Sequence, residues 1–131
     1  MSNSKIAAAL ATKLNTLNLP THWENSSFTP VAGQIYVSES LLQGTTIPIG
    51  IATGSSDELG GIYQVLVYAP MDAGKGAGRT VADTVTAAFQ RGARLTYQSV
   101  TVTIQSVSQS AAFVSGDRFV IPVSIAYRAF V

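Results

Sequence analysis

The feature that most constrains this chain is an apolar run near its middle, Ile62-Tyr-Gln-Val-Leu-Val-Tyr-Ala69. The run is rich in β-branched and aromatic residues, and Gln64 is its one strongly polar member, so it predicts a strand that is apolar on both faces. Such a strand is typical of the centre of a sheet that is covered on each side. We therefore expect a sheet protein built around residues 62–69.

The other strands are predicted from the alternation of apolar and polar residues. The clearest is Arg118–Val131, in which Ile121, Val123, Ile125 and Tyr127 face one way and a partly apolar set faces the other. A final strand with two partly apolar faces suits a surface that another subunit covers. The remaining predicted strands are Gln34–Leu42, a short one around Ile47–Ala52, Ala93–Tyr97 and Val100–Gln105.

Residues 6, 10, 14 and 17 are isoleucine or leucine at helical spacing, which predicts a helix from Ser2 or Ser4 to about Leu17. Asn18 and Pro20 are expected to end it. A second helix is predicted from a Thr80 cap to about Gln90, followed by Arg91-Gly92 as a C-terminal charge and a C′ glycine. Three loops are expected: a mobile one at Thr53–Gly60, a glycine-rich one at Pro70–Gly78, and a turn or hairpin loop at Ser108–Asp117.

The order of these segments is helix, strands, helix, strands, with no regular strand–helix–strand repeat. This order predicts an α+β fold in which a single mixed β-sheet carries two helices packed on one side. A chain of 131 residues is long enough for one core and too short for two, so residues 1–131 are expected to form a single domain.

The sequence offers little material for catalysis or metal binding. It has no cysteine and one histidine, His22, and its carboxylates show no spacing of a metal loop or an acid–base pair. We therefore expect a non-enzymatic protein with no catalytic residues, no metal and no cofactor. The alternative is a small enzyme or ligand-binding domain, in which His22 or Asp83 would be the residues to test.

One motif resembles a nucleotide-binding loop, Gly74-Lys-Gly-Ala-Gly-Arg-Thr80. A phosphate-binding loop needs a lysine followed directly by serine or threonine, whereas Lys75 is followed by glycine. The glycines Gly74, Gly76 and Gly78 also miss the spacing of a dinucleotide fingerprint. The segment is better interpreted as a flexible basic loop that contacts another protein.

Charged residues make up 11% of the chain, against about 25% in ordinary soluble domains. The mean hydropathy is +0.28. One interpretation is a monomer rich in small residues; the other is a surface covered by neighbouring copies, which favours a symmetric homo-oligomer. The net charge of +1 argues against tight binding of bare duplex DNA. No apolar run is long enough for a membrane span, and no signal peptide is expected.

Several segments together resemble the phage tail terminator-like proteins of long-tailed bacteriophages. The segments that carry the resemblance are Trp23-Glu-Asn25 with Phe28-Thr-Pro30, then Gln34-Ile-Tyr-Val37, Gly61–Pro70 with the helix ending Phe89-Gln-Arg-Gly92, and the last strand Phe119–Phe130. They span most of the chain, in order and at plausible spacing.

The resemblance implies a tail terminator-like fold and a hexameric ring that caps the head-proximal end of the phage tail tube. Such a ring ends tube polymerisation and provides the docking surface for the head or neck. The implied partners are copies of the chain itself, the major tail tube protein and a head completion or neck protein, with DNA only as cargo in the lumen. The implied location is the virion tail, after assembly in the host cytoplasm. The alternatives are another tail-tube or neck (head–tail adaptor) protein, or a monomeric binding module.

The residues expected at subunit or tube contacts lie in a basic group near the second helix and in the last strand. The basic group is interpreted either as a rim that docks an acidic partner or as charges that suit a helix end. The connector around Trp23 is either core or contact. The expected contact residues are Lys75, Arg79, Arg91, Arg94, Tyr127, Arg128 and Phe130.

Overall fold

A computed structural model describes residues 3–24, 29, 34–44, 47–48, 57–70, 74–98 and 100–130 of the chain. Within these ranges two helices interrupt a series of strands, in the general order that the sequence predicts. The elements are α1 (Asn3–Asn15), β1 (Thr21–His22), β2 (Tyr36–Gln43), β3 (Ile47–Pro48), β4 (Asp57–Pro70), α2 (Gly74–Ala88), β5 (Arg94–Tyr97), β6 (Val100–Gln109), β7 (Phe113–Ser115) and β8 (Arg118–Phe130).

All of these strands belong to one sheet with the order β1-β2-β4-β8-β6-β5, in which β3 also pairs with β4 and β7 with β8. β1 runs parallel to β2, and the other pairs are antiparallel. The sheet is therefore mixed, as predicted. The apolar run 62–69 lies in β4, between β2 and β8, so its predicted central place is confirmed.

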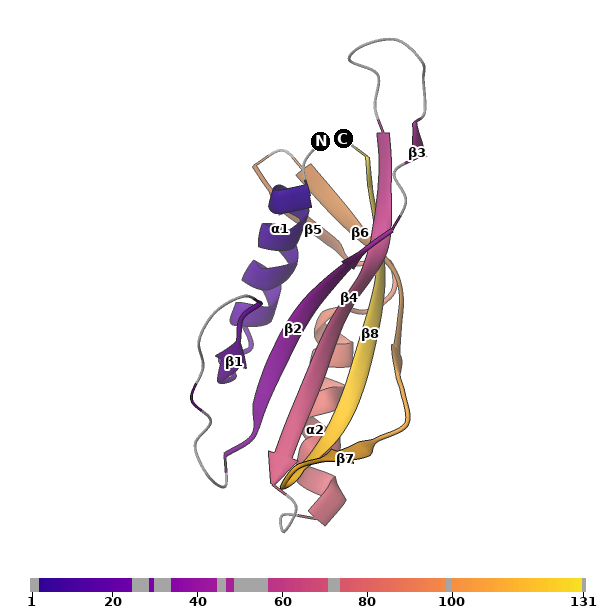
Figure 1. Cartoon of the computed structure of the whole chain (residues 1–131). Helices are drawn as coiled ribbons and strands as arrows, with labels where there is room; N and C mark the ends of the chain where they lie inside the picture. Colours follow the sequence, from indigo (N-terminus) through magenta and orange to yellow (C-terminus); the bar gives the residue numbers. More distant parts are fainter. Residues whose placement is uncertain are drawn as a thin grey trace.

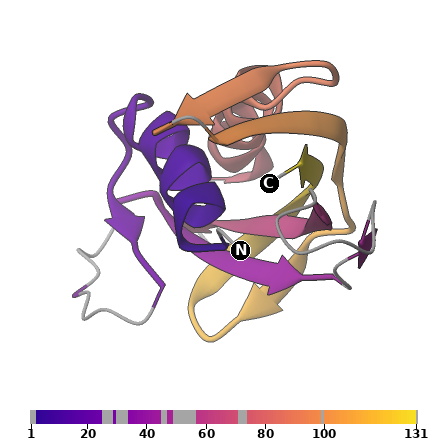
Figure 2. The same ribbon diagram turned by 90° about the horizontal axis from the view of Figure 1, so that it is seen from above.

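Both helices lie on the same side of the sheet, as predicted, and the sheet curls around them (Figures 1 and 2). α1 packs against β5 and β6, while α2 packs against β8 and β4. The curl follows from the right-handed twist that strands accumulate across a sheet. The result is one concave face that holds the helices and one outer face that does not.

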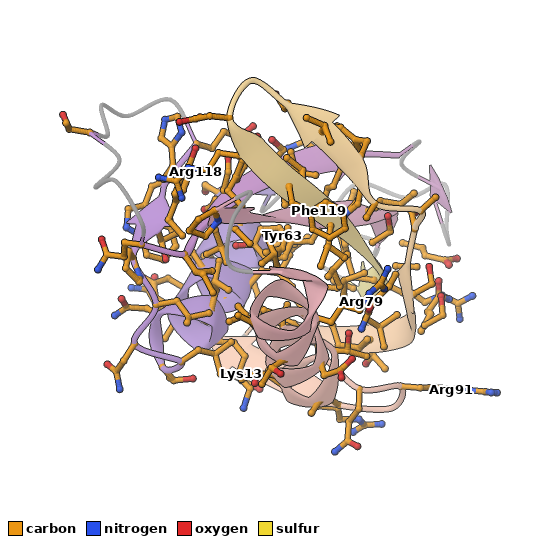
Figure 3. The ribbon with its side chains drawn as sticks, turned by 90° about the horizontal axis from the view of Figure 1, so that it is seen from below. Lys13, Tyr63, Arg79, Arg91, Arg118 and Phe119 are labelled. Atoms are coloured by element: carbon orange, nitrogen blue, oxygen red, sulfur yellow. The ribbon has the colours of Figure 1, made fainter. Side chains whose placement is uncertain are left out.

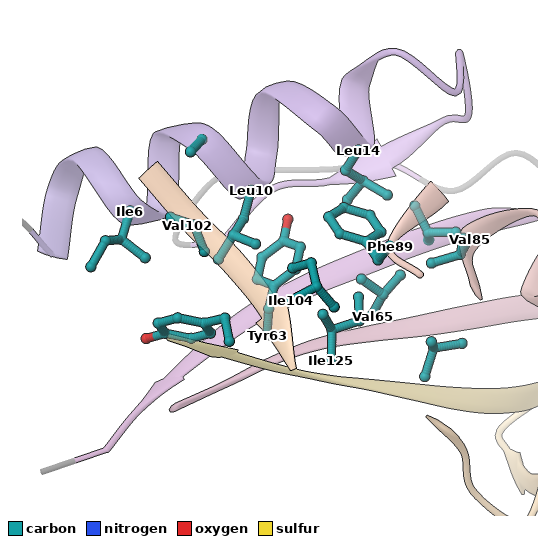
Figure 4. Packing of buried hydrophobic residues seen from close by; sticks show 14 of the residues in the cluster. Ile6, Leu10, Leu14, Tyr63, Val65, Val85, Phe89, Val102, Ile104 and Ile125 are labelled. Atoms are coloured by element: carbon teal, nitrogen blue, oxygen red, sulfur yellow. The ribbon is translucent and has the colours of Figure 1, made fainter. Parts of the chain in front are cut away.

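The core lies between the helices and the concave face (Figure 4). Ile6, Leu10 and Leu14 form the predicted stripe of α1, and each is 0% exposed. Directly after α2, Phe89 packs its ring against Tyr63 of β4, with 5.9 Å between the ring centroids. From β8, the odd-numbered residues of the predicted inner face are buried in the same core cluster: Ile121, Val123, Ile125 and Tyr127.

The glycine-rich stretch is helical from Gly74, so the predicted loop up to Gly78 and the predicted cap at Thr80 are wrong. Gly78 lies where this helix meets the sheet, because a Cβ at this position would lie 3.0 Å from the Cβ of Ala69 and 3.3 Å from Ile121 Cδ1. The absence of a side chain lets α2 approach the sheet closely. Thr80 lies inside the helix, and its hydroxyl donates a hydrogen bond to the carbonyl oxygen of Gly76 at 2.9 Å.

Two other predicted loops are partly strand. Residues 57–60, expected in a mobile loop, form the start of β4, where Leu59 is buried at 3% exposure. Residues 108–117 contain the end of β6 and the short strand β7. The helix boundaries agree better with the sequence, since Asn18 follows α1 with a φ of 55° and Gly92 follows α2 with a φ of 86°. The predicted features at Ser2, residues 25–28, 30–33, 49–56 and 71–73 lie outside the described residues.

The central strand β4 is not covered on both faces by the described residues, in contrast to the prediction. Its concave face is buried, with Val65 and Val67 at 0% exposure. On its outer face Ile62 is 41% exposed. The other outer-face residues of β4 are partly shielded by side chains of the neighbouring strands. Tyr68, for example, stacks on Tyr36 of β2, with 4.7 Å between the ring centroids.

Candidate assembly surfaces

The predicted basic group lies along the outside of α2 and the start of β5. Arg79, Arg91 and Arg94 are exposed, and Figure 3 shows Arg79 and Arg91 on a different side of the molecule from Arg118. Within the described part of the chain, no salt bridge joins any of the three to a carboxylate. Lys75 lies in the first turn of α2, and its side chain is outside the described residues. Arg79 follows Gly78, which packs on Ile121 near the start of β8, whereas Arg94 pairs with Thr103, whose partner in β8 is Arg128 near its end. The structure therefore does not gather the three arginines into one cluster.

The contact residues predicted in the last strand, β8, do not all lie on the same face of the sheet. The Tyr127 side chain is 1% exposed, on the core face, so the prediction that it contacts another subunit is wrong for this conformation. Arg128 is on the outer face, and its Nε lies 2.7 Å from Glu58 Oε1 across the β4–β8 pair. The backbone of Phe130 pairs with Glu58, and its side chain is outside the described residues. Because Arg128 and Glu58 are partly exposed, their pair contributes at most about 1 kcal/mol.

Two groups of exposed apolar side chains remain on the described surface. On the outer face of the sheet, Leu42 of β2 and Ile62 of β4 are paired in register and are 51% and 41% exposed. On β7, Phe113 and Val114 are 47% and 57% exposed. Sequence reasoning placed the second pair in a loop and did not single it out. Two apolar residues in a row, with no alternation of apolar and polar residues around them, do not predict a strand.

Arg118 at the start of β8 is a further residue that the sequence did not reveal. It is 8% exposed, its guanidinium donates to the carbonyl oxygen of Gln34, and it lies 5.0 Å from the centroid of the Tyr36 ring. Tyr36 in turn stacks on Tyr68 of β4. This cation–π and stacking arrangement ties the ends of β2, β4 and β8 together, so its role is structural.

A half-buried carboxylate, Glu39 of β2, lies on the concave face of the sheet. Tyr63 donates a hydrogen bond from its hydroxyl to Glu39 Oε2 at 3.1 Å. Burial raises the pKa of Glu39, the hydrogen bond opposes this effect, and the nearby charge of Glu24 adds to it. Burial also raises the pKa of Tyr63, so its hydroxyl stays protonated and remains the donor. Glu24 itself accepts a hydrogen bond from the backbone nitrogen of Leu41 at 3.4 Å.

Replacing Glu39 by Gln tests this carboxylate. Because its folded pKa lies above the ordinary 4.5, ionisation in the folded state costs stability at pH 7, and this cost disappears as the pH falls through the raised pKa toward 4.5. We expect Glu39→Gln to raise the free energy of unfolding at pH 7, with a difference from the wild type that shrinks toward zero below pH 4.5. Urea denaturation across this pH range measures it. A difference of the same size at every pH would contradict the assignment.

The residues considered for catalysis do not form a site. Asp83 accepts a hydrogen bond from Gln109 Nε2 at 2.8 Å, which ties α2 to β6. His22 lies in β1, and Trp23 beside it is partly buried and packs against the core cluster. Among the described residues, no group of three His, Asp or Glu side chains is placed to hold a metal ion. No helix in the described ranges has the length and apolar character of a membrane span.

Comparison with known proteins places the chain among phage tail components. The family described as "Phage tail terminator protein" matches residues 5–127. One similar solved structure is 24% identical, with a TM-score of 0.81 over 98% of this chain and 96% of that chain. A chain in a structure titled "Virion of native gene transfer agent (GTA) particle" is 18% identical, with a TM-score of 0.62 over 98% of this chain and 96% of its own. No curated protein matches the sequence. The two structural matches show the same fold.

Proposed function

This chain belongs to the phage tail terminator family, and we propose that it forms a hexameric ring that caps the head-proximal end of the phage tail tube. The family is structural, and the ring needs no chemistry to act. The observation that carries the proposal is the family match over nearly the whole length of the chain. The fold shared with a chain of a gene transfer agent virion supports a place in a virion tail.

A closed ring agrees with the surface of the described residues. A head-to-tail contact repeated around a closed rotation leaves no unused contact within the ring, yet the two ends of the ring differ. One end can then bind the last ring of tube subunits, while the other offers no copy of that surface and so stops growth. The low charge of the chain and its exposed Leu42, Ile62, Phe113 and Val114 are consistent with a surface that other subunits cover.

The partners proposed for the ring are the major tail tube protein on one end and a head completion or neck protein on the other. DNA passes through the lumen as cargo only, in line with the net charge of +1. Arg128 and the start of α2, with Lys75 and Arg79, are proposed contact regions. Tyr127 is left out of this set because it is buried.

Light scattering and negative-stain microscopy of the purified protein test the ring. We expect a mass six times the monomer mass of 13.7 kDa, and ring-shaped particles, either alone or after addition of tail tubes. A tube subunit would instead polymerise into filaments. A mass of one chain at every concentration, with no multi-copy particle at tube ends, would overturn the ring.

A further inference from the structure

We propose that Glu24 blocks the open edge of β2 and so keeps copies of this chain from pairing edge to edge. An edge strand presents a row of backbone donors and acceptors with which another chain can pair. Natural sheets block such edges with charged side chains or with very short edge strands, and this edge has both. The inference does not depend on the proposed ring, because it concerns a contact that the fold suppresses.

The open edge lies beyond the end of β1. β1 has two residues and pairs only with Val37 and Ser38, whereas β2 continues to Gln43. Among the described strands, no other lies on this side of β2. The last residues of β2 are therefore paired with β4 on one side and with no described strand on the other.

The direction of the backbone shows which groups of β2 point to this edge. The N–H of Val37 donates toward β1, to the carbonyl oxygen of Pro20 at 2.9 Å. Backbone groups alternate in direction along a strand, so the odd-numbered residues Leu41 and Gln43 direct their N–H and C=O groups to the same edge. Between them, Leu42 is 51% exposed. This short stretch thus offers both backbone groups and apolar area to another strand.

The carboxylate of Glu24 lies on this edge. Glu24 is exposed, and its Oε2 accepts a hydrogen bond from the Leu41 nitrogen at 3.4 Å. The side chain takes the place of the backbone carbonyl that a longer parallel strand would offer. Its charge lies near that of Glu39, and among the described residues no salt bridge neutralises either glutamate. A strand that paired here would have to displace the carboxylate and bury its own carbonyl oxygens beside two negative charges, which disfavours pairing.

Removing the carboxylate tests the inference. We expect Glu24→Ala and Glu24→Gln each to form species larger than those of the wild type, at protein concentrations about tenfold lower than the wild type needs, because both lose the charge. Asp117→Asn is the matched control, since it removes one exposed negative charge from the turn between β7 and β8, and it is expected to keep the wild-type mass. Analytical ultracentrifugation over a range of concentrations measures the mass, and circular dichroism checks that each variant is folded.

A new charge on the same edge separates edge pairing from other association. Gln43 is exposed, and we expect Gln43→Lys added to Glu24→Ala to restore the wild-type mass, because a lysine on an edge strand also blocks pairing. Hydrogen exchange locates the contact, since the amides of Leu41 and Gln43 are expected to become protected in the associated Glu24→Ala protein.

Three results would overturn the inference. The first is a folded Glu24→Ala protein with the wild-type mass at every concentration. The second is association that Gln43→Lys leaves unchanged, and the third is equal association of Asp117→Asn. A wild type that forms no ring would overturn the proposed function alone, because blocking of the edge is measured as the difference between each variant and the wild type.

Discussion

Replacing Phe89 by Ala is expected to lower the free energy of unfolding by about 3–5 kcal/mol. Phe89 ends the buried stripe of α2, is 0% exposed and packs its ring against Tyr63. Truncation removes this apolar area from the junction of α2 and β4 and leaves a cavity that the surrounding side chains fill only partly. Because α2 carries Arg79, one of the proposed contact residues, we also expect the variant to lose assembly. Urea denaturation followed by circular dichroism measures the stability.

Thr84→Ala on the same helix is the matched control for Phe89→Ala. Thr84 is exposed, and its hydroxyl donates only to the carbonyl oxygen of Thr80 at 3.0 Å. Its replacement is expected to change the free energy of unfolding by no more than about 0.5 kcal/mol. A loss below about 1 kcal/mol for Phe89→Ala would mean that α2 does not pack on β4 as described.

Gly61→Ala is expected to be the most damaging change of a glycine, at about 3 kcal/mol. A Cβ at Gly61 would lie 2.4 Å from the Leu42 carbonyl oxygen, and 2.9 Å from both the Gly44 nitrogen and the Tyr127 hydroxyl. Two of these obstacles are backbone atoms of the neighbouring chain segment, which is also held by the Gly44 N–H donating to the Gly60 carbonyl oxygen at 2.7 Å. The end of the β2–β4 pair, where Gly61 lies opposite Gln43, would have to open to admit the methyl group.

Gly76→Ala is expected to stabilise the protein, in contrast to Gly61→Ala. Gly76 is helical and exposed, and a Cβ there would meet nothing within 4 Å. Removing the backbone freedom of glycine is expected to stabilise α2 by up to about 1 kcal/mol. Thermal unfolding of the two variants compares them directly. Equal effects of the two substitutions would contradict the close packing of β2 on β4 at Gly61.

The spacing of apolar residues was sufficient to predict the elements in which buried residues repeat at a regular interval. The stripe of α1, the alternation of β8 and the apolar run in β4 each predict their element, because one face of each must meet the core. The pattern failed where packing overrides propensity. The glycines from Gly74 predict a loop, yet they form the start of α2, where Gly78 packs closely against Ala69 and Ile121.

The candidate surfaces were predictable to a smaller extent. The arginines could be singled out because half of the basic residues fall near one helix. The alternation of the last strand already placed Tyr127 on the same face as Ile121, Val123 and Ile125, and the burial of that face in the core argues against Tyr127 as a contact residue. The exposed edge at Phe113 and Val114, and the cluster of Arg118 with Tyr36, depend on register between distant strands, which one sequence does not specify.

We propose that this protein ends the growth of a tail tube. Purified tube subunits polymerising in its presence, with tube lengths measured by electron microscopy, test this function. We expect that tubes exposed to the protein stop elongating, each with one ring at one end, and that added subunits no longer lengthen them from that end. Tubes that grow through the bound protein, or that incorporate it along their length, would show that it does not end tube growth.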